Sequence, residues 1–378
     1  MKITVSIIKA DVGSVGGHAQ PHPQMFEACK AVLAQGVEKG IINDFHVTRV
    51  GDDINLLMVH EQGEDNPKVH GLAWEAFQSA TKVAKELQLY AAGQDILSDA
   101  FSGNVRGMGP GAAEMTFEPR KSEPLIFLMA DKTEPSAFTI PLCRVFLDPF
   151  TTTGLLIDQR MRKGFEFEVV DVLDNLKVSL NSPEETYDIL TLLSDTTRYA
   201  IKRIISREQG IGPAAVVSTE KLNVTAGKYV GKDDPVCVLR AQAGLPAVGE
   251  ILQPFMTPIL VAGWCRGSHY GAWYPCSVND SSPTYFDGPP RIAGVSLQVT
   301  GGRFQGCEPK GSPPGEHIPV DLFCGSCWDT ARLKAIEICD YIRRHGPIMP
   351  AVVPPEEMEY TTRPEVMKRL LPRLKKYK

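Results

Sequence analysis

The sequence predicts an α/β fold in which strands outnumber helices and the sheets are antiparallel or mixed. Three observations predict it: strand-like apolar runs recur along the whole chain, the amphipathic helical segments are few and segregated, and no regular strand–helix–strand series is present. The 378 residues suffice for a large core, and no convincing linker divides them. We therefore expect a single domain spanning residues 1–378.

The N-terminal part of the chain contains two predicted strand regions and two predicted helices. "ITVSIIKAD" (3–11) is typical of a buried strand, and residues 23–39 place apolar side chains at helical spacing. "FHVTRVGDDINLLMVHE" (45–61) predicts two strands joined at Gly51-Asp52-Asp53. Asn66-Pro67 then indicates the start of a long amphipathic helix that reaches about Leu89.

The remainder of the chain is richer in predicted strands. Ser182-Pro183-Glu184-Glu185 predicts the start of a helix that runs to about Arg207, and a last helix is expected from Trp328 to Arg344. The expected strands are "PLIFLMAD" (124–131), "FEFEVVDVLD" (165–174), and residues 214–219, 236–241, 258–264, 292–299 and 317–323.

Composition and charge narrow the function classes. The net charge is -5 and no long basic block is present, which argues against nucleic acid as a partner. No apolar run approaches the roughly 18 residues that span a bilayer, so we expect a cytoplasmic protein with no membrane partner. The nine cysteines are scattered and odd in number, so no disulfide framework is expected. Cys324 and Cys327 form the single Cys-x-x-Cys, which is half a zinc site at most; structural cysteines are the first interpretation, and a redox or metal role is the alternative.

Carboxylates gather where predicted strands end. Asp11, Asp52-Asp53 and Asp131 are three such groups, and Asp233-Asp234 is a fourth. Hard oxygen ligands at this density suit Mg²⁺, and His18 and Gln94 are further candidate ligands. Aspartate at a strand end is also ordinary turn chemistry, so a shared metal site requires that these groups converge in space.

The stretch "GKYVGKDDPV" (227–236) places Lys232 directly before two aspartates. An exposed lysine beside acidic residues is one interpretation, and a neutral amine that forms a Schiff base is the other. Tyr229 lies three residues earlier, where a phenol could move protons beside a carbonyl carbon.

Phosphate groups have candidate partners as well. The glycine-rich "SGNVRGMGPGAAE" (102–114) does not open a helix, so we reject a dinucleotide-binding fingerprint. The backbone N–H groups of Gly103 and Asn104 could still form an anion-binding nest. Lys132 and Arg266 are candidate cations for phosphate.

Taken together, seven segments resemble the archaeal-type bifunctional fructose-1,6-bisphosphate aldolase/phosphatases, the class V fructose-1,6-bisphosphatases. The resemblance covers nearly the whole chain. It rests on "IKADVGSVGGH", "VGDDINLLM", "YAAGQDILSDAFSGNVRGMGPG", "MADKTEP", "TAGKYVGKDDPV", "GWCRGSHYG" and "EEMEYTT".

The resemblance implies a single-domain four-layer α-β-β-α sandwich, a homo-octamer and several Mg²⁺ ions. It also implies two gluconeogenic reactions. Dihydroxyacetone phosphate and glyceraldehyde 3-phosphate are joined through a lysine Schiff base to give fructose 1,6-bisphosphate. Mg²⁺-dependent hydrolysis of the 1-phosphate then gives fructose 6-phosphate.

The resemblance also implies roles for individual residues. Lys232 would form the Schiff base, Tyr229 would transfer the proton of the aldol half, and Asp11 would activate water in the phosphatase half. The metal ligands would be Asp11, His18, Asp52, Asp53, Gln94, Asp131, Asp233 and Asp234. The sugar and its phosphates would contact His18, Tyr90, Gln94, Gly103, Asn104, Lys132, Gln242, Arg266 and Asp287.

One departure and two alternatives remain. The family is expected to have an aromatic hydroxyl near position 347 or 348, where this chain has Pro347-Ile348. A Mg²⁺-dependent sugar phosphatase without aldolase activity would explain the acidic groups without Lys232. A protein that binds divalent cations only to stabilise its fold would explain them without any catalysis.

Overall fold

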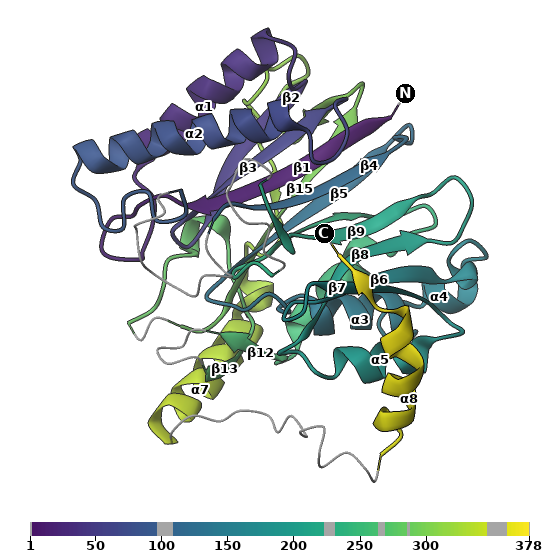
Figure 1. Cartoon of the computed structure of the whole chain (residues 1–378). Coiled ribbons are helices and arrows are strands. Elements are labelled where there is room, and N and C mark those ends of the chain that lie inside the picture. The colour runs from purple at the N-terminus through teal and green to yellow at the C-terminus, as the bar shows by residue number, and fades with distance from the viewer. Residues whose placement is uncertain are drawn as a thin grey trace.

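The computed structural model describes residues 2–96, 109–222, 231–263, 269–285, 288–345 and 361–377. Two large, mainly antiparallel sheets lie against each other, with helices on their outer faces (Figure 1). The predicted α/β class is confirmed, and no closed barrel is present among the described strands. None of the described helices is long and apolar enough to cross a bilayer. The single-domain assignment stays a prediction.

The first sheet has the strand order β10-β4-β1-β3-β2. Its central strand β1 is buried along its whole length, because it pairs with β3 on one side and β4 on the other. The hairpin predicted around Gly51-Asp52-Asp53 is confirmed as β2 and β3. The strands are β1 (Ile3–Asp11), β2 (Asp44–Val50), β3 (Asp53–His60), β4 (Gly111–Phe117) and β10 (Glu220–Lys221).

Helices α1 (Pro23–Glu38) and α2 (Pro67–Glu86) cover the outer face of this sheet (Figure 1). Both were predicted, and both begin with a proline that needs no N–H partner in the first turn. Asn66 caps α2, since its side chain accepts a hydrogen bond from the N–H of Lys68 at 2.9 Å. Ile8, Ala10 and Val12 point toward these helices.

The second sheet has the order β14-β15-β5-β11-β9-β8-β6-β7-β18, and β16 and β17 also pair with β15. The pairings are antiparallel except that between β14 and β15. Its strands are β5 (Glu123–Asp131), β6 (Phe165–Asp171), β7 (Leu176–Asn181), β8 (Tyr199–Ser206), β9 (Pro213–Val217), β11 (Val236–Arg240), β14 (Tyr274–Pro275), β15 (Arg291–Thr300), β16 (Arg303–Gln305), β17 (Val320–Asp321) and β18 (Lys375–Lys376). A separate pair consists of β12 (Leu260–Gly263) and β13 (His269–Ala272).

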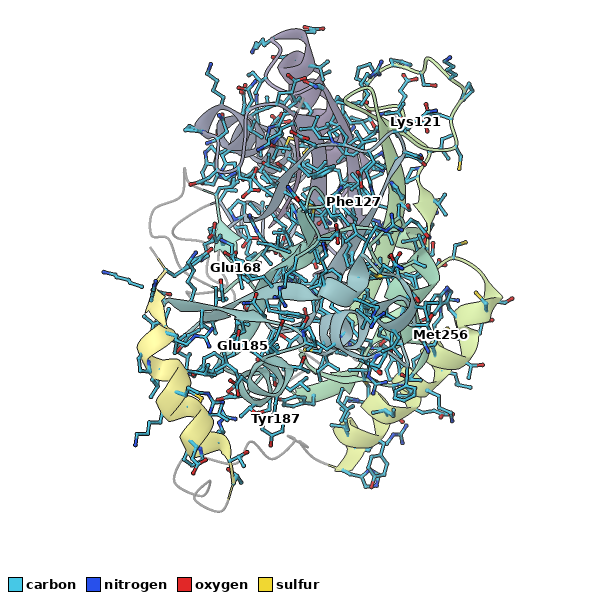
Figure 2. All side chains as sticks on the ribbon, turned by 90° about the vertical axis from the view of Figure 1, so that its right-hand side faces the viewer. Lys121, Phe127, Glu168, Glu185, Tyr187 and Met256 are labelled. Carbon is cyan, nitrogen blue, oxygen red and sulfur yellow. The ribbon has the colours of Figure 1, made fainter. Side chains whose placement is uncertain are left out.

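Apolar side chains fill the space between the two large sheets. Alternate residues of β1, namely Ile3, Val5 and Ile7, face alternate residues of β5, among them Phe127 and Met129. Figure 2 shows Phe127 deep in the interior, far from surface residues such as Lys121 and Tyr187. Side chains alternate along a strand, so the residues that follow Ile7 in β1 and Met129 in β5 on this same face also lie between the sheets. These following residues are polar.

A third apolar cluster lies on the far face of the second sheet, beneath a mixed set of helices. The order of packing supports the four-layer arrangement implied by the resemblance, which stays a prediction. The remaining helical segments are α3 (Thr139–Leu147), α4 (Gly154–Ile157), η1 (Met161–Lys163), α5 (Thr186–Leu193), α6 (Val248–Leu252), η2 (Gln253–Met256), η3 (Val278–Asp280), η4 (Ser326–Trp328), α7 (Asp329–His345), α8 (Arg363–Leu370) and η6 (Leu371–Arg373).

The helix predicted over 182–207 is wrong in its second half. The helix α5 ends at Leu193, and residues 199–206 form β8. Ser194 and Thr197 use their hydroxyls in local hydrogen bonds, which compete with helix continuation. The following "YAIKRIIS" is rich in β-branched residues and pairs with β6 and β9. The strand predicted over 317–323 shrinks to Val320–Asp321, whereas the predicted last helix is confirmed as α7.

Candidate functional site

The polar end of the space between the two sheets begins at the hairpin of β2 and β3. The register of β1 and β3 places Asp11 opposite Asp53, so both carboxylates face the second sheet. Gly51 turns the chain with φ +55°, a left-handed conformation that disfavours side chains. A Cβ at Gly51 would lie 2.1 Å from Oδ2 of Asp131. The glycine therefore lets the end of β5 approach the hairpin.

The first group of candidate ligands consists of Asp11, His18 and Asp52, whose ligand atoms all lie within 4.8 Å of one another. His18 Nδ1 is 2.7 Å from Asp52 Oδ2 and 3.7 Å from Asp11 Oδ2. These contacts with Asp11 and Asp52 raise the pKa of His18 to about 10. Burial, together with the neighbouring Asp52 charge, raises the pKa of Asp11 to about 8. The ring of Tyr90 meets that of His18 edge-on, with centroids 5.0 Å apart.

The second group consists of Asp53, Asp131 and Asp234, again with ligand atoms within 4.8 Å. Asp53 comes from the first sheet, and the other two come from the strand ends of the second sheet. Burial is the largest cause that raises the pKa of each carboxyl to about 6. The convergence in space that a shared metal site requires is therefore present, and the converging carboxylates come from both sheets.

Two buried lysines balance part of this negative charge. Lys9 is fully buried; it pairs with Asp53, and its Nζ lies 3.9 Å from Asp234. Lys132 Nζ lies 3.1 Å from a carboxylate oxygen of Asp52 and 3.1 Å from one of Asp131. Burial lowers the pKa of both lysines, but the surrounding carboxylates outweigh it and raise both above their usual value.

Lys9 was missed by the sequence reasoning. The available signal was a lysine inside an apolar strand, on the face that carries Ile3, Val5 and Ile7. A charged side chain in that position is expensive to bury unless partners are supplied, so it marks a polar site at the strand end.

Lys232 lies beside these groups and is only 4% exposed. Its Nζ is 3.6 Å from Oδ2 of Asp95, a residue that the sequence reasoning also missed. The Asp95 carboxylate accepts hydrogen bonds from the N–H of Asp11 at 2.9 Å and of Gly109 at 3.1 Å. Asp95 therefore connects the strand end that bears Asp11 with the side chain of Lys232.

The donor set fits a hard divalent cation. Both oxygens of Asp131 are buried without a hydrogen bond among the described residues, although Lys132 lies at ion-pair distance from one of them. The buried Oε1 of Gln94 also lacks a hydrogen-bond partner there. Asp131 belongs to the second carboxylate group, and an oxygen-ligated metal bound there would satisfy its unpaired buried oxygens. Asp233 is largely buried nearby but belongs to neither group.

Several predicted site residues lie outside the described residues, namely Gly103, Asn104, Tyr229, Arg266 and Asp287, as does Pro347-Ile348. Gln242 is described, but within a single chain it lies far from this site. It follows the end of β11 at Arg240, opposite Leu125, whereas Val236 at the other end pairs with Met129 near Asp131. Six residues of extended chain span roughly 20 Å. A substrate contact from Gln242 stays a prediction.

The chain matches the family model described as fructose-1,6-bisphosphatase over residues 2–375. A fructose-1,6-bisphosphate aldolase/phosphatase of Ignicoccus hospitalis is 55% identical over 377 residues, which cover 100% of this chain and 94% of the relative. Relatives of the same name from Thermococcus kodakarensis and Methanocaldococcus jannaschii are each 54% identical. Both matches cover 98% of this chain, with 97% and 91% of the respective relatives.

Proposed function

The chain belongs to the fructose-1,6-bisphosphatase family, and we propose that it is a bifunctional fructose-1,6-bisphosphate aldolase/phosphatase. It would condense dihydroxyacetone phosphate with glyceraldehyde 3-phosphate and then hydrolyse the 1-phosphate of the product. The observation that carries this proposal is the position of Lys232. A buried lysine suited to carbonyl chemistry lies next to two carboxylate groups suited to phosphate chemistry.

For the aldol half, we propose Lys232 as the nucleophile. Its neutral amine would attack C2 of dihydroxyacetone phosphate, and loss of water would leave a protonated imine. Tyr229 would take a proton from C3 to give an enamine, whose C3 attacks the aldehyde carbon of glyceraldehyde 3-phosphate. The new alkoxide takes up a proton, and water then cleaves the imine to free Lys232 and fructose 1,6-bisphosphate.

For the phosphatase half, we propose that Asp11 accepts a proton from the attacking water. The bond between phosphorus and the C1 oxygen breaks, the C1 oxygen takes up a proton, and fructose 6-phosphate and inorganic phosphate leave. Bound Mg²⁺ would lower the pKa of water and offset charge on the phosphate. Its proposed ligands are the residues of the two groups together with Gln94 and Asp233, and the unsatisfied oxygens of Asp131 and Gln94 support this choice.

The substrate contacts are proposals of the same kind. Tyr90 is 58% exposed beside His18, where it can contact a sugar that enters from solvent. Lys132 has φ +62°, an uncommon conformation for lysine that directs its side chain toward both carboxylate groups. The homo-octamer, which rests on family membership, and the cytoplasmic location, which is expected from the sequence, are also proposals.

Because Lys232 is followed directly by Asp233 and Asp234, the same segment must serve both halves. We propose that this segment presents the lysine in one state and the carboxylates in the other. Gly231 supports a turning point there, since it has φ +96°. Gly227, the second proposed turning point, lies outside the described residues.

Borohydride trapping tests the proposal. The protein is incubated with Mg²⁺ and dihydroxyacetone phosphate, reduced, digested and analysed by mass spectrometry. A three-carbon phosphate adduct on Lys232 is expected, and Lys232→Ala should abolish both the adduct and condensation. Lys39→Ala, at the exposed end of α1, is the matched control and should keep both.

A sugar phosphatase without aldolase activity is the second candidate, because both carboxylate groups are complete without Lys232. Release of phosphate from fructose 1,6-bisphosphate by folded, Mg²⁺-loaded protein that yields no adduct would favour it. In that case Lys232 would be only a charge partner of Asp95.

A further inference from the structure

One row of residues crosses the first sheet at its polar end. In β1, Lys9 is paired with Asn55 of β3 on one side and with Gly111 of β4 on the other. Gly111 is in turn paired with Lys221 of β10. Directly opposed residues of antiparallel strands point to the same face, so this row faces the second sheet. Gly111 is the single position in the row without a side chain, and it lies between two lysines.

The side chain of Lys232 occupies the space left at Gly111. A Cβ built on Gly111 would lie 2.7 Å from Cγ of Lys232, 3.3 Å from Cδ and 3.5 Å from Cε. The stem of the lysine therefore runs across the glycine from the second sheet. The backbone of Gly111 is outside the left-handed region, so its conformation does not demand glycine. The close approach of Lys232 explains the glycine instead.

The backbone on either side of Lys232 and the amine at the end of its side chain are also held in place. The preceding residue, Gly231, donates its N–H to the carbonyl of Thr219 at 2.8 Å, and Asp234 donates to the carbonyl of Thr133 at 3.0 Å. At the tip, Nζ lies 3.6 Å from Asp95, whose carboxylate is fixed by two backbone N–H groups. Backbone, stem and tip are thus restrained by three different parts of the fold.

We propose that Gly111 and Asp95 form a socket that aims the amine of Lys232, with Gly111 as a positioning residue for the aldol half. The inference rests on the proposed function in that Lys232 is taken as the Schiff-base lysine. A methyl group at 111 would clash at Cγ, near the root of the side chain, and force another rotamer. A displacement of about 1 Å at a reacting group can cost on the order of a hundredfold in rate.

The test compares Gly111→Ala with a control glycine. Gly71→Ala is suitable, because Gly71 lies in α2 and a Cβ there would meet nothing within 4 Å. In Mg²⁺-loaded protein with dihydroxyacetone phosphate, Gly111→Ala should slow borohydride trapping of Lys232 at least tenfold. It should affect phosphate release from fructose 1,6-bisphosphate much less, and Gly71→Ala should leave both unchanged. Trapping in Gly111→Ala at the wild-type rate would overturn the socket.

A second measurement does not depend on the aldol reaction. The urea midpoint is compared for Gly111→Ala in the wild-type background and in a Lys232→Ala background, as a double-mutant cycle. The socket predicts a lower midpoint in the first background and little change in the second, where the space is empty. An equal drop of the urea midpoint in both backgrounds would mean that the substitution destabilises β4 itself, and this result would overturn the inference. If wild-type protein yields no adduct but this coupling is found, the proposed function fails, while the packing of Lys232 against Gly111 stands.

Discussion

At the scale of single residues, the site is defined by buried side chains whose oxygen atoms lack hydrogen-bond partners among the described residues. Asp131 is fully buried, both of its oxygens lack a hydrogen bond among the described residues, and Gly51 is shaped to let it approach. A buried carboxylate is costly without compensation; Lys132 lies at ion-pair distance from one oxygen of Asp131, and a bound cation would supply a partner for the other. That position was predicted from sequence as a strand-end aspartate, whereas its unsatisfied state became visible only in the structure.

Replacing Asp131 with asparagine should weaken metal binding more than folding. Asparagine keeps the size but supplies one neutral oxygen, so the apparent affinity for Mg²⁺ should fall by about tenfold or more. Calorimetric titration of the folded protein measures this, with Asp158→Asn, whose carboxylate binds the neighbouring Arg160 near the surface, as the control. An unchanged affinity in Asp131→Asn would exclude Asp131 as a ligand.

At the scale of elements, a buried ion network fastens the segment after β16 to the first sheet. The imidazole of His317 lies 2.9 Å from Asp44, at the start of β2, and 2.9 Å from Glu308. With a carboxylate at each nitrogen, the charged imidazolium satisfies both. Burial lowers the pKa of His317, but the contacts with Asp44 and Glu308 outweigh it and the net pKa is raised. Burial likewise opposes the shift of Glu308, whose pKa is nevertheless lowered to about 2, chiefly by His317.

This network predicts how stability depends on pH. A raised histidine pKa means that its contribution is complete below the unfolded value of about 6.5 and is lost as pH rises through the folded value. A lowered Glu308 pKa means that its contribution is present above about 4.5 and is lost as pH falls toward 2. The stability advantage of wild type over His317→Phe should therefore be greatest near pH 5 to 6.

Urea unfolding at pH 5.5 should show that His317→Phe lowers the free energy of unfolding by about 3 kcal/mol, because two carboxylates lose a buried partner. The difference from wild type should shrink by pH 9. His345→Phe, in the exposed last turn of α7, is the control and should show no such trend. A difference that is the same at both pH values would contradict a charged His317.

At the scale of the whole molecule, the two sheets bring their acidic strand ends to one place. Asp53 belongs to the first sheet, Asp131 ends β5 of the second, and Asp234 lies just before β11 of the second, so mutual repulsion opposes the packing of the sheets. Lys9 and Lys132 relieve part of that repulsion. A cation bound between the groups would relieve more of it and would couple metal binding to global stability.

Mg²⁺ should therefore raise the unfolding free energy of the whole protein. At a free Mg²⁺ concentration of 100 times the dissociation constant, one site adds about 2.7 kcal/mol to the free energy of unfolding. A chelator should remove this stabilisation. Thermal unfolding with and without Mg²⁺ at constant ionic strength measures the effect, and Asp131→Asn should show a smaller one. Identical unfolding in both conditions would mean that the carboxylate groups hold no metal.

The sequence by itself determined the α/β class, the β2–β3 hairpin, the helices α1, α2 and α7, and the acidic residues at strand ends, because these follow from local periodicity and turn chemistry. Its resemblance also identified the family. The tertiary structure alone decided which strand ends meet, because pairing between distant strands depends on register and packing that no local pattern specifies. It revealed that Lys9 neutralises Asp53, that Asp95 holds Lys232, and that Gly111 leaves room for it. It also showed β8 within the range predicted as a helix, because the β-branched residues of that segment and its pairing with β6 and β9 favour a strand.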